Sequence, residues 1–383
     1  MKFLNKQFTQ ETLKLALPVM LTQVGQVSVN LFDNIIVGKL LGAKALAAVS
    51  LGNAMFFSIF IFGLGFSLAI PPLVSEAHSQ HDHNRINSIF RHGFVVNIIL
   101  AFVLMLLIFG IIPLMPYLNQ PKEILPDTIT FLSIVTLSII PFMIFQTMRE
   151  VSEGLSFTIG VTKATIFANI INVILNYVFI EHFKMGVAGS AWATFIARVA
   201  MMVFLYYVLI KEEKTRRYIK DFSLKIKDFT KEMFEKLIRL GFPTALQLFF
   251  EVTAFAGAAF ICGLISAKDI AAHQIALSMA SFTFNLCVGF SVASTVMIGR
   301  KLGEKDFVNL EKVGFNNLKI AFIFMLMCGL VFILGKDVLP TFFTKKEDIA
   351  VVELASQLMI IAALFQLSDG IQVTALGCLR GIQ

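Results

Sequence analysis

Long apolar stretches recur along almost the whole chain, and they limit its possible folds more than any other feature. Only 15% of the residues are charged, against roughly 25% in soluble domains. A run of about 20 apolar residues is long enough to cross a membrane as a helix. The sequence therefore predicts an all-α polytopic membrane protein, with ten spans centred near Val27, Phe60, Leu104, Ile139, Val173, Val199, Phe255, Phe284, Met325 and Ala362.

Basic residues are distributed unevenly among the polar segments. The longest of these segments, residues 211–239, holds ten Lys or Arg and six acids. The loops after the second and eighth spans are also basic, so all of these segments follow even-numbered spans. By the positive-inside rule they lie in the cytoplasm together with the N-terminus. We expect a multi-pass protein of the cell inner membrane, and the net charge of +7 does not indicate a nucleic-acid partner.

The two halves of the sequence repeat each other. The spacing between matching positions stays near 220–225 residues over about 130 positions, as shown by Pro18 and Pro243, residues 65–69 and 289–293, Asp82 and Asp306, and residues 145–146 and 365–366. Six spans, an even number, precede the second copy. Both halves therefore enter the membrane from the same side, which is typical of transporters built from parallel repeats around a cavity.

The repeat predicts how the chain is divided. We expect an N-terminal lobe over residues 1–210 with spans 1–6, a basic linker over residues 211–239, and a C-terminal lobe over residues 240–383 with spans 7–10. Two homologous lobes of six and four spans would then surround a central cavity. The counterparts of spans 5 and 6 would follow Gln383, so the C-terminal lobe is expected to be incomplete.

Three acidic residues, Asp33, Glu251 and Asp369, interrupt the apolar runs. An acid at the centre of a membrane helix costs roughly 2.5–3.5 kcal/mol on insertion scales and usually faces a protein interior or water. A proton or Na⁺ would neutralise such a carboxylate and change which conformation is stable. If an organic cation competes for the same charge, the ion and the cation are exchanged across the membrane.

Polar residues lie three or four positions apart within the spans, several of them around these acids, and share a helical face. They are Asn30, Asp33 and Asn34; Asn172 and Asn176; Thr194 and Arg198; Gln247 and Glu251; and Gln366, Asp369 and Gln372, with Phe365 on the same stripe. Such stripes can line a watery lumen, but single Asn or Thr residues can also serve only as hydrogen bonds between helices. Arg198 either pairs with an acid or extends towards a lipid head group.

The sequence contains no motif for catalysis or metal binding. Its four cysteines lie singly in apolar runs, and no spacing of Cys and His suggests a zinc site. We interpret four neighbouring histidines as residues of a solvated loop: His78, His81, His83 and His92. No catalytic residue, no bound metal and no cofactor is predicted, and the chain is not expected to be an enzyme.

Several of these stretches resemble the multidrug and toxic compound extrusion (MATE) family in its NorM-like branch. They are residues 30–38, Asn172 with Asn176, residues 189–194, residues 248–252, residues 365–369 and residues 379–381. The resemblance implies two six-helix lobes, of which this chain would lack the last two helices. It also implies a secondary-active multidrug efflux antiporter that exports organic cations and other xenobiotics in exchange for Na⁺ or H⁺.

The resemblance further implies two binding sites. A cation site in the C-terminal lobe contains Glu251 and Asp369, to which we add their neighbours Gln247 and Phe365. A proton or substrate site in the N-terminal lobe is formed by Asp33, Asn172 and Asn176, to which we add Asn34 and Thr194. Phe365 stands where the family often has an aromatic hydroxyl, which leaves the identity of the ion open. A monomer in the lipid bilayer is expected.

Two alternatives stay open on the sequence. A flippase for lipid-linked saccharides would need a ring of Arg and Lys around its cavity to hold a pyrophosphate, and Arg198 is the one such residue deep in a predicted span. The second alternative is a non-transporting remnant of a longer protein.

Overall fold

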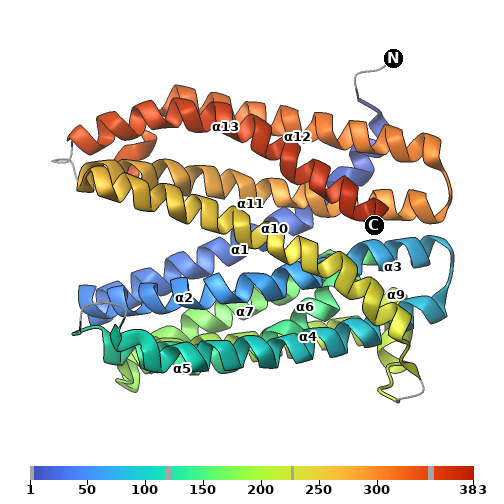
Figure 1. Ribbon diagram of the computed structural model, residues 1–383, viewed down its shortest axis with the longest axis horizontal. Coiled ribbons are helices and arrows are strands. Elements are labelled where there is room, and N and C mark those ends of the chain that lie inside the picture. The colour runs from blue at the N-terminus through green and yellow to red at the C-terminus, as the bar shows by residue number, and fades with distance from the viewer. Residues whose placement is uncertain (1–3, 118–121, 226–227, 344–348) are drawn as a thin grey trace. The chain divides into compact units, whose positions relative to one another are not determined.

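The computed structural model describes residues 4–117, 122–225, 228–343 and 349–383. Within these ranges all regular secondary structure is helical (Figure 1). The α-helices are α1 (Lys6–Leu41), α2 (Ala43–Ser67), α3 (Ile70–Ser79), α4 (His83–Ile111), α5 (Leu125–Leu137), α6 (Ile139–Gly154), α7 (Ile159–Tyr177), α8 (Gly186–Lys211), α9 (Glu213–Lys220), α10 (Lys231–Ile265), α11 (Ala267–Gly303), α12 (Phe307–Gly335) and α13 (Ile349–Ile382). Short 3-10 or π turns follow α4 (Ile112–Tyr117), α7 (Val178–His182) and α12 (Leu339–Phe342).

Among the described residues, nine helical segments are long and apolar enough to cross a membrane. A tenth candidate consists of α5 and α6, which meet at a bend of 43°. The prediction of about ten spans is therefore confirmed, but the fourth span is broken where the sequence predicted a single helix. Pro141 explains the bend, because it has no N–H to donate to the carbonyl of Leu137 and its ring crowds that carbonyl.

The described chain divides into two compact units. We call residues 25–249 the N-terminal unit, and residues 1–24 with residues 250–383 the C-terminal unit. Two long helices, α1 and α10, pass from one unit to the other, and each contains an internal proline, Pro18 or Pro243. Both helices begin about three turns before the proline, so the two prolines lie inside the helices. The predicted boundaries of the lobes stay a prediction.

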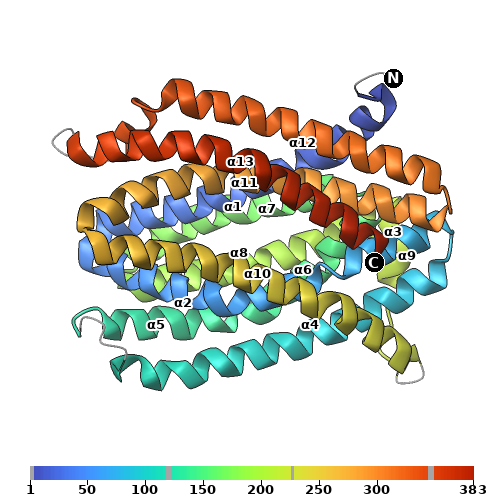
Figure 2. The same cartoon turned by 45° about the horizontal axis from the view of Figure 1, so that its top comes forward.

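Each unit has its own apolar core. In the N-terminal unit, one cluster surrounds Leu73 and Leu205 and a second surrounds Phe131 and Val135. In the C-terminal unit, a cluster around Met325 joins the first part of α1 to α11, α12 and α13. Figures 1 and 2 both show α12 and α13 side by side. Leu106 on α4 and Leu334 on α12 expose 66% and 84% of their area, as expected for side chains that face lipid.

A glycine allows a close helix contact at matching positions of the two units. A Cβ atom on Gly65 of α2 would lie 2.7 Å from the backbone nitrogen of Ala245 on α10. A Cβ atom on Gly289 of α11 would lie 2.8 Å from the carbonyl oxygen of Ala16 on α1. Gly65 and Gly289 are matching positions of the repeat. The second helix of each half therefore packs on the first helix of the other half, with small residues at the contact.

The space around each glycine predicts different effects on stability for two substitutions. Gly65→Ala is expected to lower the thermal unfolding temperature, because its methyl group would overlap the α10 backbone, and overpacking costs about 1–3 kcal/mol. The matched control is Gly110→Ala on α4, where a new Cβ meets no atom within 4 Å. That control should be neutral or slightly stabilising. Equal melting temperatures for both detergent-purified variants would contradict the assigned contact.

The turns before α4 and α12 have the same backbone structure. His81 and Lys305 adopt left-handed conformations, with φ of 56° and 57°. The next residues, Asp82 and Asp306, cap the following helix by accepting a hydrogen bond from the backbone N–H three positions later, at 2.9 and 3.3 Å. These are matching positions of the repeat, so the repeat extends to the conformation of its loops.

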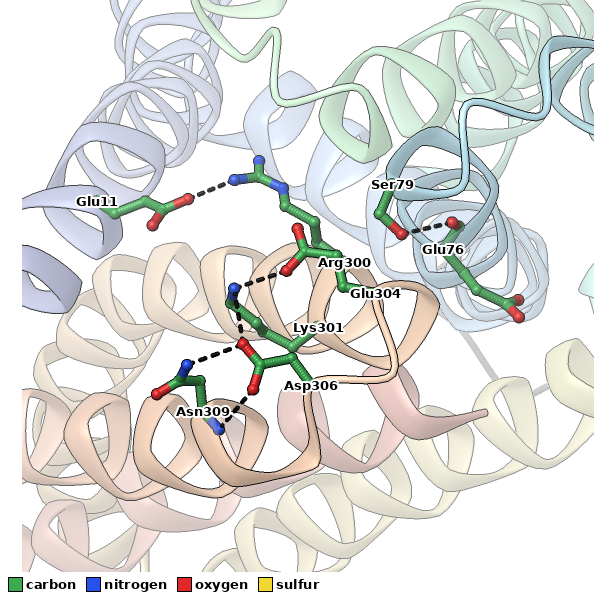
Figure 3. Close-up of polar contacts among 8 residues, drawn as sticks. All are labelled: Glu11, Glu76, Ser79, Arg300, Lys301, Glu304, Asp306 and Asn309. Carbon is green, nitrogen blue, oxygen red and sulfur yellow. Dashed lines mark hydrogen bonds and ion pairs between the residues drawn. The ribbon is translucent and has the colours of Figure 1, made fainter.

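Hydrogen bonds from Asn309 are the main reason why the pKa of Asp306 lies below its ordinary value, and Lys301 at 3.3 Å contributes (Figure 3). A carboxylate with a lowered pKa stabilises the fold above its ordinary pKa of 3.8, and this contribution is lost as the pH falls through the lowered value. We expect Asp306→Ala to lower the melting temperature at pH 7, with a difference from the parent that shrinks towards pH 3. Glu311→Ala, at an exposed position of α12, should show no such difference. A constant difference across this pH range would contradict the capping role.

The segment between α8 and α10 packs against α4. His92 on α4 is fully buried, and its Nε2 accepts a hydrogen bond from the backbone N–H of Thr230 at 2.9 Å. Its Nδ1 lies 2.7 Å from the Ser88 carbonyl oxygen, and its ring packs against those of Phe229 and Phe234. The interpretation of the histidines as solvated loop residues is therefore wrong for His92, which holds the start of α10 in place.

Candidate functional site

The first candidate site, in the N-terminal unit, is built around Asp33 on α1. This side chain is 8% exposed, and Nδ2 of Asn176 on α7 donates a hydrogen bond to its Oδ1 at 2.5 Å. Asn172, one helical turn earlier on α7, is buried too. Among the described residues, the amide oxygens of both asparagines have no hydrogen-bond partner. A carboxylate with two spare amide oxygens is a suitable set of acceptors for a proton donor or a hard cation.

Two other predicted members of this site are not brought together with Asp33. Asn34 follows it directly on α1 and is exposed, because neighbouring residues of an α-helix point about 100° apart. Thr194 on α8 is partly buried, and no hydrogen bond within the described residues joins it to Asp33. Grouping polar residues by helical spacing therefore placed Asp33 and the adjacent Asn34 on one face, although their side chains point in different directions.

Arg198 on α8 belongs to this neighbourhood and was left open by the sequence. Its Nη1 donates a hydrogen bond to Ser138 Oγ at 2.6 Å. Its guanidinium carbon lies 4.7 Å from the ring centre of Phe56 and 5.0 Å from that of Phe142. The charges of Arg198 and Asp33 attract each other. Within the described residues no ion pair joins Arg198 to an acid; its guanidinium is held by a hydroxyl and two rings.

The second candidate site, in the C-terminal unit, contains two acids. Asp369 on α13 is 6% exposed, and Glu251 on α10 is partly buried. Their negative charges interact unfavourably, while Arg380 on α13 attracts Glu251. The Asp369 carboxylate makes no hydrogen bond or ion pair with the described residues. Two neighbouring acids in such a place become more stable when a cation or a proton neutralises one of them.

Phe365 and Gln247, the other predicted members of the second site, and Gln366 of the same polar stripe lie in different environments. Phe365, one turn before Asp369, exposes 42% of its area and packs its ring edge-on against Phe255. Gln366 is fully buried, and its Oε1 accepts a hydrogen bond from Thr283 on α11 at 2.9 Å. Gln247 lies one turn before Glu251, in the part of α10 that belongs to the N-terminal unit. No set of three or more His, Cys, Asp or Glu side chains in the described chain could hold a metal ion.

A third group of charges is paired internally. On α6, Arg149 Nε donates to Glu153 Oε1 at 2.8 Å, and both residues are buried together with Glu150. The repeat aligns Arg149 with Asp369, since residues 145–146 match residues 365–366. The same position therefore carries a paired cation in one unit and an unpaired acid in the other. This difference favours a structural role for α6 and a binding role for the corresponding part of α13.

Comparison with known proteins places these sites in context. The model of the family described as MatE matches residues 18–178 and 243–383, which correspond to the two copies of the repeat. The chain is 30% identical to the multidrug resistance protein NorM of Photobacterium profundum, over 97% of this chain and 82% of that protein. It is 33% identical to the probable multidrug resistance protein NorM of Agrobacterium fabrum, over 97% and 81%.

Solved structures share the fold at lower identity. The crystal structure of the eukaryotic MATE transporter AtDTX14 superposes with a TM-score of 0.88 at 15% identity, over 98% of this chain and 83% of that one. An outward-facing structure of a multidrug resistance MATE family transporter of the MOP superfamily gives a TM-score of 0.86 at 20% identity, over 97% and 82%. These likenesses confirm the predicted all-helical, multi-span architecture.

Proposed function

Because this chain belongs to the MATE family of multidrug efflux transporters, with NorM proteins among its relatives, we propose that it exports organic cations in exchange for Na⁺ or H⁺. The family consists of membrane transporters and not of enzymes. The observation that supports ion coupling most strongly is the buried Asp369 carboxylate, which lies near Glu251 and has no bonded partner among the described residues. Maintaining such an acid in a membrane protein is costly unless it binds something.

The two acids of the C-terminal unit bind the coupling ion in this proposal. One Na⁺ or one proton at Glu251 and Asp369 relieves the repulsion between their charges. Gln247 and Phe365 are proposed to assist this ion: an amide can contribute an oxygen to Na⁺, and a ring face attracts a cation. Because binding changes the charge of the site, it changes the relative stability of the inward-open and outward-open states, which is the requirement for coupling.

Asp33 forms a second site, which takes a proton or the cationic substrate. Asn172 and Asn176 present amide oxygens beside the carboxylate, and Asn34 and Thr194 are proposed to contact the substrate in another conformation. A ligand that neutralises Asp33 competes with any other ligand for the same charge. Exchange of ion for substrate then follows from rocking of the two lobes, residues 1–210 and 240–383.

We propose that the protein lies in the cell inner membrane as a monomer with its N-terminus in the cytoplasm. The basic segment of residues 211–239 supports this orientation. Labelling of a cysteine introduced at the exposed Lys214 should need permeabilised cells when a membrane-impermeant thiol reagent is used. Labelling in intact cells would reverse the orientation.

Gradient-driven transport in proteoliposomes tests the proposed function. The purified full chain is reconstituted, and movement of a fluorescent monocation such as ethidium is followed under an imposed Na⁺ gradient or an imposed pH gradient, each applied alone. One of the two gradients should drive the dye against its own gradient, and its collapse by an ionophore should stop transport. Dye movement at the rate of protein-free vesicles under both gradients would refute the proposal.

A further inference from the structure

A buried histidine holds the start of α10. Nε2 of His92 lies 2.9 Å from the backbone nitrogen of Thr230, whose N–H can only donate. Nδ1 lies 2.7 Å from the carbonyl oxygen of Ser88, which can only accept. These two partners determine the protonation of the ring, because one nitrogen must be a donor and the other an acceptor. His92 is therefore neutral, with its proton on Nδ1, and its Nε2 binds the residue directly before α10.

An asparagine at the matching position of the repeat makes the same hydrogen bond in the C-terminal unit. Asn316 on α12 corresponds to His92 on α4. Its Oδ1 accepts a hydrogen bond at 2.9 Å from the backbone N–H of Asn5, the residue directly before α1. Asn5 itself corresponds to Thr230. Each half therefore holds the start of a long helix of the other half through one side-chain acceptor, but one acceptor is an amide and the other is an imidazole.

The imidazole can change its hydrogen-bonding character with pH, whereas the amide cannot. Histidine is the side chain whose charge ordinarily changes between pH 5 and 8. A second proton on His92 would occupy Nε2, so that its new N–H would face the N–H of Thr230. Two donors would then oppose each other where a hydrogen bond existed. The new charge would also be buried beside the rings of Phe229 and Phe234, which is costly without a partner.

The surroundings of His92 offer no counter-charge in contact with its ring. Its neighbour Arg91 pairs with Asp228 at 2.9 Å and donates to the Asp221 carbonyl oxygen at 3.1 Å. Further charged or titratable residues lie on the helices around it: Glu76 and His78 on α3, His83 and Arg85 on α4, Arg149, Glu150 and Glu153 on α6, Arg217, Tyr218 and Lys220 on α9, and Lys231, Glu232, Glu235 and Lys236 on α10. Within the described ranges, none of them forms a hydrogen bond or an ion pair with the His92 ring. Protonation therefore weakens the attachment of α10 without creating a new ion pair.

We propose that His92 is a pH-sensitive clamp on α10: its neutral ring holds the start of this helix against α4, and uptake of a proton releases it. The clamp responds to the pH on the side of the membrane where the basic segment of residues 211–239 lies. Further along, α10 carries Glu251 into the C-terminal unit, so the clamp acts on a helix that both units share. It operates whichever ion or substrate the protein carries, and its test needs no transport.

Hydrogen exchange of the purified full chain, followed by mass spectrometry, tests the clamp. Peptides that cover residues 228–240 are compared between the parent and His92→Gln at pH 8 and at pH 5. Glutamine places an amide oxygen at the reach of Nε2, and this oxygen does not titrate. The two proteins should exchange within about twofold of each other at pH 8. At pH 5 the parent should exchange about tenfold faster than His92→Gln, which is the effect of losing one buried hydrogen bond. Comparison at equal pH cancels the chemical effect of pH on exchange.

Two controls come from the chain itself. Peptides over residues 5–15, where Asn316 supplies the acceptor, should exchange equally in the parent and in His92→Gln at both pH values. His83→Gln removes another histidine of α4, whose Nδ1 lies 2.8 Å from the Tyr218 hydroxyl, and should keep the pH dependence of the parent. His92→Asn, which copies the residue of the matching position, replaces the Gln variant if that protein is not monodisperse.

The clamp is refuted if the parent and His92→Gln show the same ratio of exchange rates at pH 8 and at pH 5. It is also refuted if the pH dependence disappears in His83→Gln, because another histidine would then be responsible. A merely structural role of His92 would make exchange faster in the variant at both pH values and leave no difference between them.

Discussion

Replacing Glu251 by Gln is expected to abolish gradient-driven export without unfolding the protein. Glutamine has nearly the same size, but it can neither carry a negative charge nor take up a proton. Loss of one member of a buried charge interaction typically costs roughly 2–5 kcal/mol, so the initial rate of ethidium transport should fall about a hundredfold. Asp369→Asn is expected to have the same effect, because the two side chains are proposed to bind one ion together.

The double variant provides the sharper measurement. If Glu251 and Asp369 act as one site, Glu251→Gln combined with Asp369→Asn should transport no more slowly than either single variant, since groups that act as a unit are not additive. Glu353→Gln, an exposed acid on the same helix as Asp369, is the control and should transport at the parent rate. Parent-like transport by Glu251→Gln, with unchanged dependence on the driving gradient, would disprove the assigned ion site.

Replacing Arg149 by Met is expected to destabilise the N-terminal unit severely. Arg149 and Glu153 are 8% and 1% exposed as side chains, and Glu150 is also buried. Removing the cation leaves buried carboxylates without their counter-charge, and breaking a buried ion pair in this way costs about 3–5 kcal/mol. The effect is measured as the midpoint of thermal unfolding in detergent, and the loss of monodisperse protein on heating serves as the signal.

Two further variants separate charge from packing at this position. Arg149→Met combined with Glu153→Met removes both charges of the pair and should recover part of the lost stability, because a buried ion pair contributes little over apolar residues of similar volume. Lys231→Met breaks the pair with Glu235, which is 90% and 65% exposed, and should leave the midpoint unchanged. A parent-like midpoint for Arg149→Met would mean that solvent reaches this cluster.

Much of the fold follows from local properties of the chain. Lipid offers no hydrogen bonds to the backbone, so a crossing segment must be helical or part of a closed barrel, and apolar runs of this length predict helices. The repeat was visible because matching residues perform matching local tasks: Asp82 and Asp306 both cap a helix after a left-handed residue. The cost of an acid in an apolar run likewise identifies Asp33, Glu251 and Asp369 from the sequence alone.

The partners of those residues depended on the tertiary structure. Asp33 pairs with Asn176, 143 positions away, and no local pattern specifies which helices pack together. The local sequence pattern also did not predict the bend at Ser138, the hydrogen bond between Ser138 and Arg198, or the burial of His92. Helical spacing assigned Asn34 to the same face as Asp33, yet Asn34 is exposed.

The sequence by itself determined which segments cross the membrane and that they form two copies. It also identified the acidic residues whose insertion into a membrane is so unfavourable that they are candidates for function. Only the tertiary structure decided which of these charges are paired. Arg149 and Asp369 occupy matching positions, and their sequence surroundings do not reveal that one is neutralised by a buried glutamate and the other by no bonded neighbour in the described chain. The reason is physical: insertion cost is a property of one residue, whereas charge balance is a property of all the helices around it.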